Sequence, residues 1–197
     1  MKNITIFKKA ALVTSIALLT ACSDSGDTTA TDASSTSGVI TGFGSVYING
    51  VEYETDNSDI SIDGSSSAET DLGIGDVCSL QGSVNADGVT GTATAITCTD
   101  ELEGYVLDVS ALVGGVGTMN VMGQTVTITA DTVFDSDTMA SIADLVVNDI
   151  VEVHGYSDGT GNVFATRVET KDVDEDIEVK GLISNLDSIA FTFKLGS

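Results

Sequence analysis

The sequence predicts an all-β protein built from tandem, small OB-like β-barrels of about 70 residues each. Apolar and polar residues alternate around Val46 and Ile48, and again around Val151 and Val153. This period of two is typical of strands. Asn49-Gly50 separates two such runs, and the pair favours the positive φ angles of a tight hairpin. A third observation is an internal repeat that covers most of the chain.

Residues 1–21 resemble a bacterial lipoprotein signal peptide. A basic segment precedes a mostly apolar run of 12 residues, Ala10–Ala21, and the lipobox Leu19-Thr20-Ala21-Cys22 ends it. An uncleaved membrane helix is the weaker alternative, because a span needs roughly 20 apolar residues. We therefore expect lipidation of Cys22 and anchorage in the cell envelope. Ser23, directly after it, favours the outer membrane.

Residues 22–37 are expected to form a tether. After Cys22 this stretch contains only Ser, Thr, Asp, Ala and Gly. Such a composition cannot bury apolar surface, so the segment should remain solvated.

The internal repeat has an offset of 73 residues. Asp71–Val77 aligns with Asp144–Ile150 at this offset, and Ala93–Ile96 aligns with Ala165–Val168 at an offset of 72. Lys180–Ile183 resembles the beginning of the second copy. These matches divide the chain into a first repeat, a second repeat and the start of an incomplete third, at residues 38–103, 104–176 and 177–197.

A unit of this length, with five or six strands, favours a closed barrel, because closure removes unpaired strand edges. An immunoglobulin-like sandwich is the alternative, although it usually needs about 100 residues. Helix is expected only near residues 138–145, with a counterpart near residues 66–72.

The segment Gly38–Tyr53 resembles the opening signature of a bacterial family called domain of unknown function 5666. Gly75-Asp76-Val77 and Ala165-Thr166-Arg167-Val168 are similar to its recurring blocks. The resemblance covers about residues 38–197, but residues 104–118 lack the Gly-Phe-Gly-Ser element of the signature. It implies tandem copies in secreted or lipidated proteins, and it implies no activity.

Cys78 and Cys98 flank the turn at residues 85–88 and share strand parity with apolar neighbours, Leu80 and Ile96. Both thiols should therefore face the interior of one hairpin. We expect a disulfide between them, which would persist outside the cytoplasm. Two buried, reduced cysteines acting as small hydrophobes are the alternative.

No catalytic residue, metal site or cofactor is predicted. His154 shares strand parity with Glu152 and should be a solvated surface residue. Asp172, Asp174 and Asp176 are weak calcium candidates, because an EF-hand loop starting at Asp172 would have Ile177 where glycine is needed. A solvated linker is the preferred interpretation of this acidic run.

The charge balance restricts the partners. Seven Lys and Arg face 30 Asp and Glu, and neither Lys nor Arg occurs between Cys22 and Thr166. Nucleic acid and anionic lipid surfaces are therefore excluded as partners, because they need positive side chains. An envelope protein, a polysaccharide and weakly bound divalent cations remain as candidate partners. Aromatic residues fall in apolar alternation, so we expect them in the core rather than on a sugar platform.

These observations predict a lipid-anchored envelope protein, not an enzyme, that acts as a structural or partner-binding β-module, in contact with the membrane through Cys22. A calcium-dependent adhesion module and an envelope hydrolase are the alternatives. The hydrolase remains because 30 acidic residues could supply a carboxylate pair.

Overall fold

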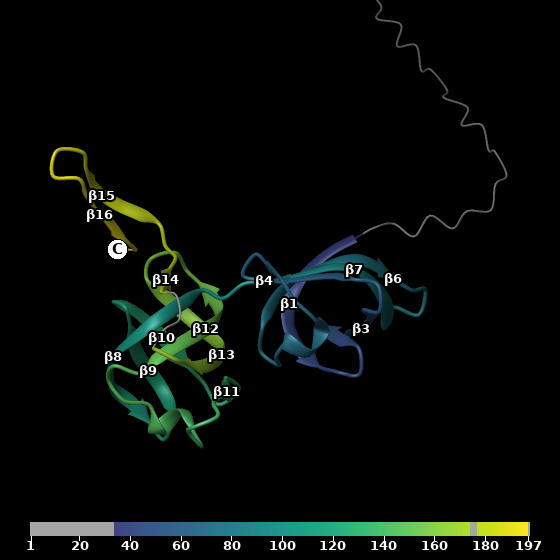
Figure 1. Ribbon diagram of the computed structural model, residues 1–197, viewed down its shortest axis with the longest axis horizontal. Helices are drawn as coiled ribbons and strands as arrows, with labels where there is room; N and C mark the ends of the chain where they lie inside the picture. Colours follow the sequence, from purple (N-terminus) through teal and green to yellow (C-terminus); the bar gives the residue numbers. More distant parts are fainter. Residues whose placement is uncertain (1–33, 174–176, 197) are drawn as a thin grey trace, which may run out of the picture. The chain divides into compact units, whose positions relative to one another are not determined.

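The computed structural model describes residues 34–173 and 177–196, and their regular structure consists of β-strands and two short 3₁₀ turns (Figure 1). The predicted signal peptide and Cys22 lie outside the described residues. Strand β1 begins at Ser34, and Ser34–Ser37 pair with residues 79–82 of β6. The last four residues assigned to the tether therefore belong to a sheet, because strand pairing uses the backbone and requires no apolar side chain.

The first sheet closes into a five-stranded barrel. Its order is β3-β2-β1-β6-β7, and a parallel pairing between β3 and β7 completes the circle. β4 continues along β7 beyond β3, and β5 pairs with β4. The strands are β1 Ser34–Gly42, β2 Val46–Ile48, β3 Val51–Glu54, β4 Asp59–Ile62, β5 Ser65–Ser66, β6 Val77–Val84 and β7 Thr90–Cys98.

The second sheet closes in the same order, β10-β9-β8-β12-β13, with a parallel pairing between β10 and β13. The all-β prediction with a closed barrel is therefore confirmed. The sandwich alternative is wrong, because the strands of each barrel belong to one closed sheet. The strands are β8 Leu102–Val113, β9 Val116–Val121, β10 Gln124–Ile128, β11 Val133–Asp135, β12 Ile150–Ser157 and β13 Asn162–Lys171.

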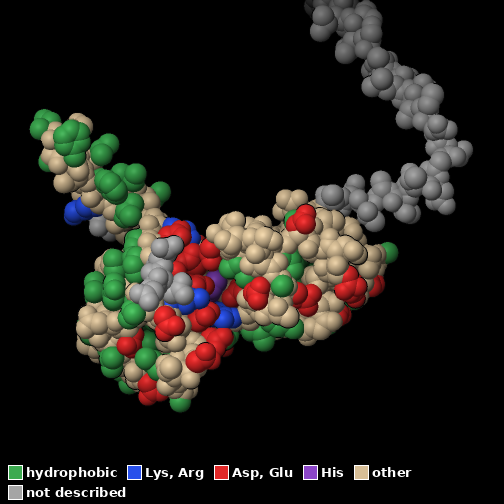
Figure 2. Space-filling model, viewed as in Figure 1, with side chains coloured by type: hydrophobic (Ala, Val, Ile, Leu, Met, Phe, Trp, Pro, Cys, Tyr) green, Lys and Arg blue, Asp and Glu red, His purple; other side chains and the backbone are tan. Residues whose placement is uncertain are grey.

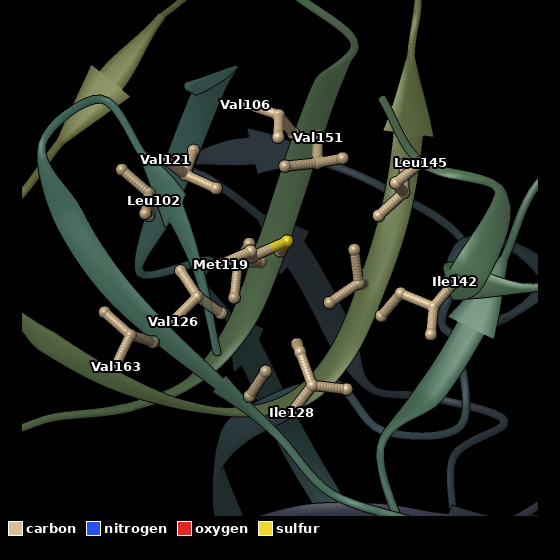
Figure 3. Packing of buried hydrophobic residues seen from close by; sticks show 13 residues of the cluster. Leu102, Val106, Met119, Val121, Val126, Ile128, Ile142, Leu145, Val151 and Val163 are labelled. Carbon is tan, nitrogen blue, oxygen red and sulfur yellow. The ribbon is translucent and has the colours of Figure 1, made fainter. Parts of the chain in front are cut away.

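Each barrel has its own hydrophobic core. In the second barrel, the alternating residues of β9 and β10 point inward, where Met119, Val121, Val126 and Ile128 pack against one another (Figure 3). The first barrel is filled in the same way by Ile40, Val46, Ile48, Leu80 and Ile96. The period of two in the sequence thus predicts which side chains face the inside of each barrel.

The expected helices are reduced to single 3₁₀ turns, Glu69–Asp71 and Ile142–Asp144. The Ser141 hydroxyl accepts a hydrogen bond from the Ala143 N–H at 3.1 Å, which starts the second turn, and Leu145 is already extended. Ile142 and Leu145 are both buried. One 3₁₀ turn is enough to bring residues i and i+3 to the same side, so no longer helix is needed.

The expectation that the aromatic residues fill the core is wrong. Among the described residues, only Tyr53 is a buried aromatic, and Tyr47 and Phe134 are half-buried. The cores are filled instead by Val, Ile and Leu, which fit the narrow interior of a five-stranded barrel. The exposed aromatic side chains are Phe43, Tyr105, Tyr156, Phe164, Phe191 and Phe193.

The residues after the second barrel form a short strand and a hairpin. β14 (Glu178–Val179) pairs with β8, and Val179 packs against the second core. β15 (Ile183–Asp187) and β16 (Thr192–Leu195) form a separate two-stranded sheet. Many of its apolar side chains are exposed, and Figure 2 shows them in green along the hairpin.

The predicted disulfide is confirmed. Cys78 and Cys98 are directly paired residues of β6 and β7, both are buried, and their sulfur atoms are 2.05 Å apart. Val151 and Thr170 form the corresponding pair of the second barrel. The bridge closes a loop of 20 residues within the first barrel.

Changing Cys78→Val and Cys98→Thr, the residues of the second barrel, should lower the free energy of unfolding by about 3 kcal/mol, because the unfolded chain is no longer cross-linked. Chemical denaturation measures this change. Reductant should destabilise the unmodified protein by a similar amount and leave the double variant unaffected.

In a Cys22→Ala background, alkylation without reductant should add no alkyl group, and two should be added after reduction. Two groups added without reductant, measured by intact mass, would contradict the bridge.

Candidate functional site: a buried ionic joint

The single histidine and the single arginine of the chain are buried together. His154 and Arg167 are paired residues of β12 and β13, and they are 2% and 9% exposed. The expectation of a solvated His154 is therefore wrong. Its parity was correct, because it points out of the second barrel, but residues of the first barrel cover it. Figure 2 shows the histidine in purple among acidic and basic side chains.

Glu152 connects the cations of the second barrel. Its Oε1 accepts from His154 Nε2 at 2.6 Å, and its Oε2 contacts Lys171 Nζ at 2.7 Å. Lys171 Nζ also lies 3.2 Å from an oxygen of Glu169. These groups alternate in charge along β12 and β13, which compensates for their burial.

Arg167 extends the network. Its Nη2 donates to Asp135 Oδ2 at 2.8 Å and to Glu169 Oε2 at 2.9 Å. Its Nη1 lies 3.5 Å from Asp76 Oδ1, and His154 Nε2 lies 3.6 Å from the same oxygen. Asp76 belongs to the first barrel, so its carboxylate lies near two cations of the second barrel, His154 and Arg167. We call the group of Asp76, Glu152, His154, Arg167 and Lys171 the ionic joint.

Asp76 also holds its own loop. Its Oδ2 accepts from the Gly73 N–H at 2.7 Å, as Asp149 Oδ2 accepts from the Val146 N–H at 2.7 Å in the second barrel. The same loop therefore occurs in both barrels. Only Asp76 carries in addition a contact with the other barrel.

Two glycines allow the first loop to approach the second barrel. The Thr166 hydroxyl donates to Gly75 O at 2.6 Å. A Cβ on Gly75 would lie 2.9 Å from the Thr166 carbonyl oxygen, and a Cβ on Gly73 would occupy the space of the Arg167 guanidinium. The second barrel has Val146 and Asn148 at the corresponding places.

The joint shifts the proton affinities of its members. Burial raises the pKa of Glu152, but hydrogen bonds from His154 and Lys171 outweigh it and lower this pKa to about 2. Burial lowers the pKa of His154, but its bond to Glu152 and the charge of Asp76 outweigh this effect and raise it. Burial raises the pKa of Asp76, because its cations lie beyond hydrogen-bond distance. His154 is thus favoured in its protonated form.

A further buried carboxylate, Asp100, is also paired with a cation from later in the chain. Asp100 lies between β7 and β8, is 3% exposed, and contacts Lys180 Nζ at 2.7 Å. Burial raises the pKa of Asp100 to about 6 in spite of this contact. Lys180 also lies 2.8 Å from Glu178, so the segment around β14 is held by charge as well as by strand pairing.

The calcium candidates are only partly described. Asp172 is exposed and lines a cavity of about 570 Å³ together with Asp137, Asp149 and Glu169. Asp174 and Asp176 lie outside the described residues. Across residues 34–173 and 177–196, no group of three or more His, Cys, Asp or Glu side chains is arranged to hold a metal ion.

The described part of the chain contains no helix of the length and apolar character needed to cross a membrane.

Replacing His154→Gln, the residue at the corresponding position 81, should destabilise the protein in a pH-dependent manner. The raised pKa of His154 stabilises the fold below the ordinary value of 6.5, and this contribution is lost as the pH rises through the higher folded value. Glu152 stays ionised over this range, because its pKa is about 2.

The difference in unfolding free energy between the two proteins should therefore be largest below pH 6.5 and shrink as the pH rises above that value. Denaturation series at several pH values measure it. A difference that is constant with pH would show that His154 acts only through its packing.

Comparison with known proteins gives one result for this region. No curated protein and no solved structure matches the chain significantly. Residues 103–169, from β8 to β13, match the model of a domain of unknown function, DUF5666. The matched range contains Glu152, His154 and Arg167, whereas Gly38–Tyr53, which carried the resemblance in the sequence, lies before it. The second barrel of the chain is thus similar to the DUF5666 domain.

Proposed function

We propose that this protein is a lipid-anchored component of the cell envelope, without catalytic activity, whose barrels present a binding surface to a partner. The observation that carries the binding role is the exposure of six aromatic side chains, five of them in residues 105–193. Aromatic side chains are enriched at binding surfaces, because they combine a large contact area with little loss of conformational entropy.

The anchor is supported by the lipobox and the basic and apolar segments before it. Acylation at Cys22 would fix the amino end in a membrane, with outer-membrane sorting as the specific proposal. Residues 23–33 would then separate the barrels from the lipid headgroups.

The two barrels are proposed to be tandem copies of one OB-like unit. The support is their common strand order, the parallel pairing that closes each of them, and the common position of the Cys78–Cys98 and Val151–Thr170 pairs. OB-like barrels commonly bind oligonucleotides or oligosaccharides on their outer face. The strong negative charge disfavours the first class here.

Changing Cys22→Ala should move the protein from the membrane fraction to the soluble fraction, because the thiol that accepts the lipid is lost. Fractionation and labelling with radioactive fatty acid measure this. Label that is still incorporated in the variant would rule out Cys22 as the anchor.

The binding role is tested with the soluble Cys22→Ala protein and isolated envelopes. We expect saturable co-sedimentation, and at least about tenfold weaker binding when the exposed aromatics of residues 105–193 are changed to Ser. Val89→Ser, an exposed apolar position of the first barrel, is the matched control and should bind normally. Equal binding by all three proteins would contradict the proposal.

A further inference from the structure

An uncharged row of side chains crosses four strands of the second barrel. Thr118 on β9 pairs with Thr127 on β10, Thr127 pairs with Phe164 on β13, and Phe164 pairs with Tyr156 on β12. Paired residues point to the same side of a sheet. Their strand neighbours Met119, Val126 and Val163 are in the core, so the row lies on the outside.

Phe164 and Tyr156 are the aromatic end of this row, and they are 54% and 48% exposed. Directly paired residues of antiparallel strands lie about 5 Å apart, a spacing comparable with the size of one sugar ring. A second row beside the first adds Asn120, Thr125 and Asn162. The two rows together, which we call the Thr/Asn/aromatic face, combine two rings with hydroxyl and amide groups.

The first barrel provides an internal comparison. Its corresponding rows are Ser83, Thr92 and Glu54, and Thr90, Glu52 and Tyr47. Two carboxylates therefore stand where the second barrel has Thr127 and Thr125, and Ser83 and Thr92 stand where it has Tyr156 and Phe164. The core does not require these differences, because the residues lie on the outside of both barrels.

The absence of charge on this face is informative in a chain with a net charge of −23. The carboxylates nearest to it in register and sequence are Asp108, opposite Asn120, and Asp158, before Asn162. Asp108 accepts from the Ser110 N–H at 2.8 Å within its own strand, whereas Asp158 accepts from Asn162 Nδ2 at 2.7 Å and therefore borders the face at its Asn162 end.

An anionic partner would be repelled by the chain as a whole, and a cationic partner would find no carboxylate among the seven residues. Hydroxyl and amide side chains both donate and accept hydrogen bonds, as sugar hydroxyls require. Aromatic faces pack against the C–H faces of sugar rings. The two rings are bordered by polar residues, unlike the continuous apolar centre of a protein interface.

We propose that the Thr/Asn/aromatic face of the second barrel binds a neutral polysaccharide. Sugar rings stack on Phe164 and Tyr156, and Thr118, Thr125, Thr127, Asn120 and Asn162 contact their hydroxyls. This inference rests on the proposed binding function and gives its partner a chemical class.

The test uses the full chain with its anchor in detergent and a panel of immobilised polysaccharides. The panel contains neutral dextran, mannan, laminarin and galactan, with anionic alginate for comparison. We expect saturable binding to at least one neutral polymer and none to alginate. Binding to no neutral polymer would overturn the inference.

The variants replace residues of the face by those at the corresponding positions of the first barrel. Tyr156→Ser with Phe164→Thr should weaken binding about tenfold or more, because the stacking surface is lost. Thr127→Glu should weaken it similarly by placing a carboxylate in the row, as Glu54 does in the first barrel. Val89→Ser, an exposed apolar position of the first barrel, should bind normally. Variants that bind like the unmodified protein would overturn the inference.

Thermal unfolding separates binding from stability. An exposed cross-strand pair contributes little to the stability of its sheet, so the Tm of each variant should change little. If the chain still co-sediments with envelopes but binds no neutral polysaccharide, the proposed function stands and this inference fails. If neither binding is observed, both fail.

Discussion

The pairing of three buried carboxylates is the constraint on which the arrangement of this chain depends. Asp76, Asp100 and Glu152 are the buried acidic residues of the described part, and leaving any of them unpaired would cost several kcal/mol. Neither Lys nor Arg occurs between residues 10 and 166. The partners His154, Arg167, Lys171 and Lys180 all come from a short stretch late in the chain. Asp76 and Asp100 are therefore paired only when residues more than 70 positions later in the chain have folded beside them.

The inside of each barrel could be predicted from the sequence, and its outside could not. Alternation identifies which face of a strand is apolar, and the equal parity of Cys78 and Cys98 with their neighbours predicted a disulfide that the structure confirms. His154 shows the limit of this reasoning. Its parity correctly places it outside its own barrel, but alternation contains no information on what covers that outside. In a chain with several barrels, a residue on the outside of one barrel can be buried by contact with another barrel.

The aromatic residues were misjudged for a related reason. Phe164 stands between Val163 and Ala165, whose side chains face the core, so alternation places Phe164 outside together with Tyr156, its paired residue on β12. A signal was nevertheless present in the sequence. In the alignment of the two repeats, Thr125 and Thr127 occupy the positions of Glu52 and Glu54. The loss of two carboxylates in so acidic a chain indicates a surface that needs uncharged side chains. The ionic joint had a weaker signal, since the only histidine and the only arginine stand on paired strands.

The contact at the ionic joint is asymmetric, because only the first barrel contributes a glycine loop to it. Gly73 and Gly75 let the first barrel approach Thr166 and Arg167, while Val146 and Asn148 place side chains on the same loop of the second barrel. The second barrel can receive this contact but cannot offer it in the same way to another molecule. Head-to-tail contacts that repeat without closing lead to filaments. Within the described residues, the loop of the first barrel makes this contact with the second barrel of the same molecule, so the surface around Thr166 and Arg167 is already covered.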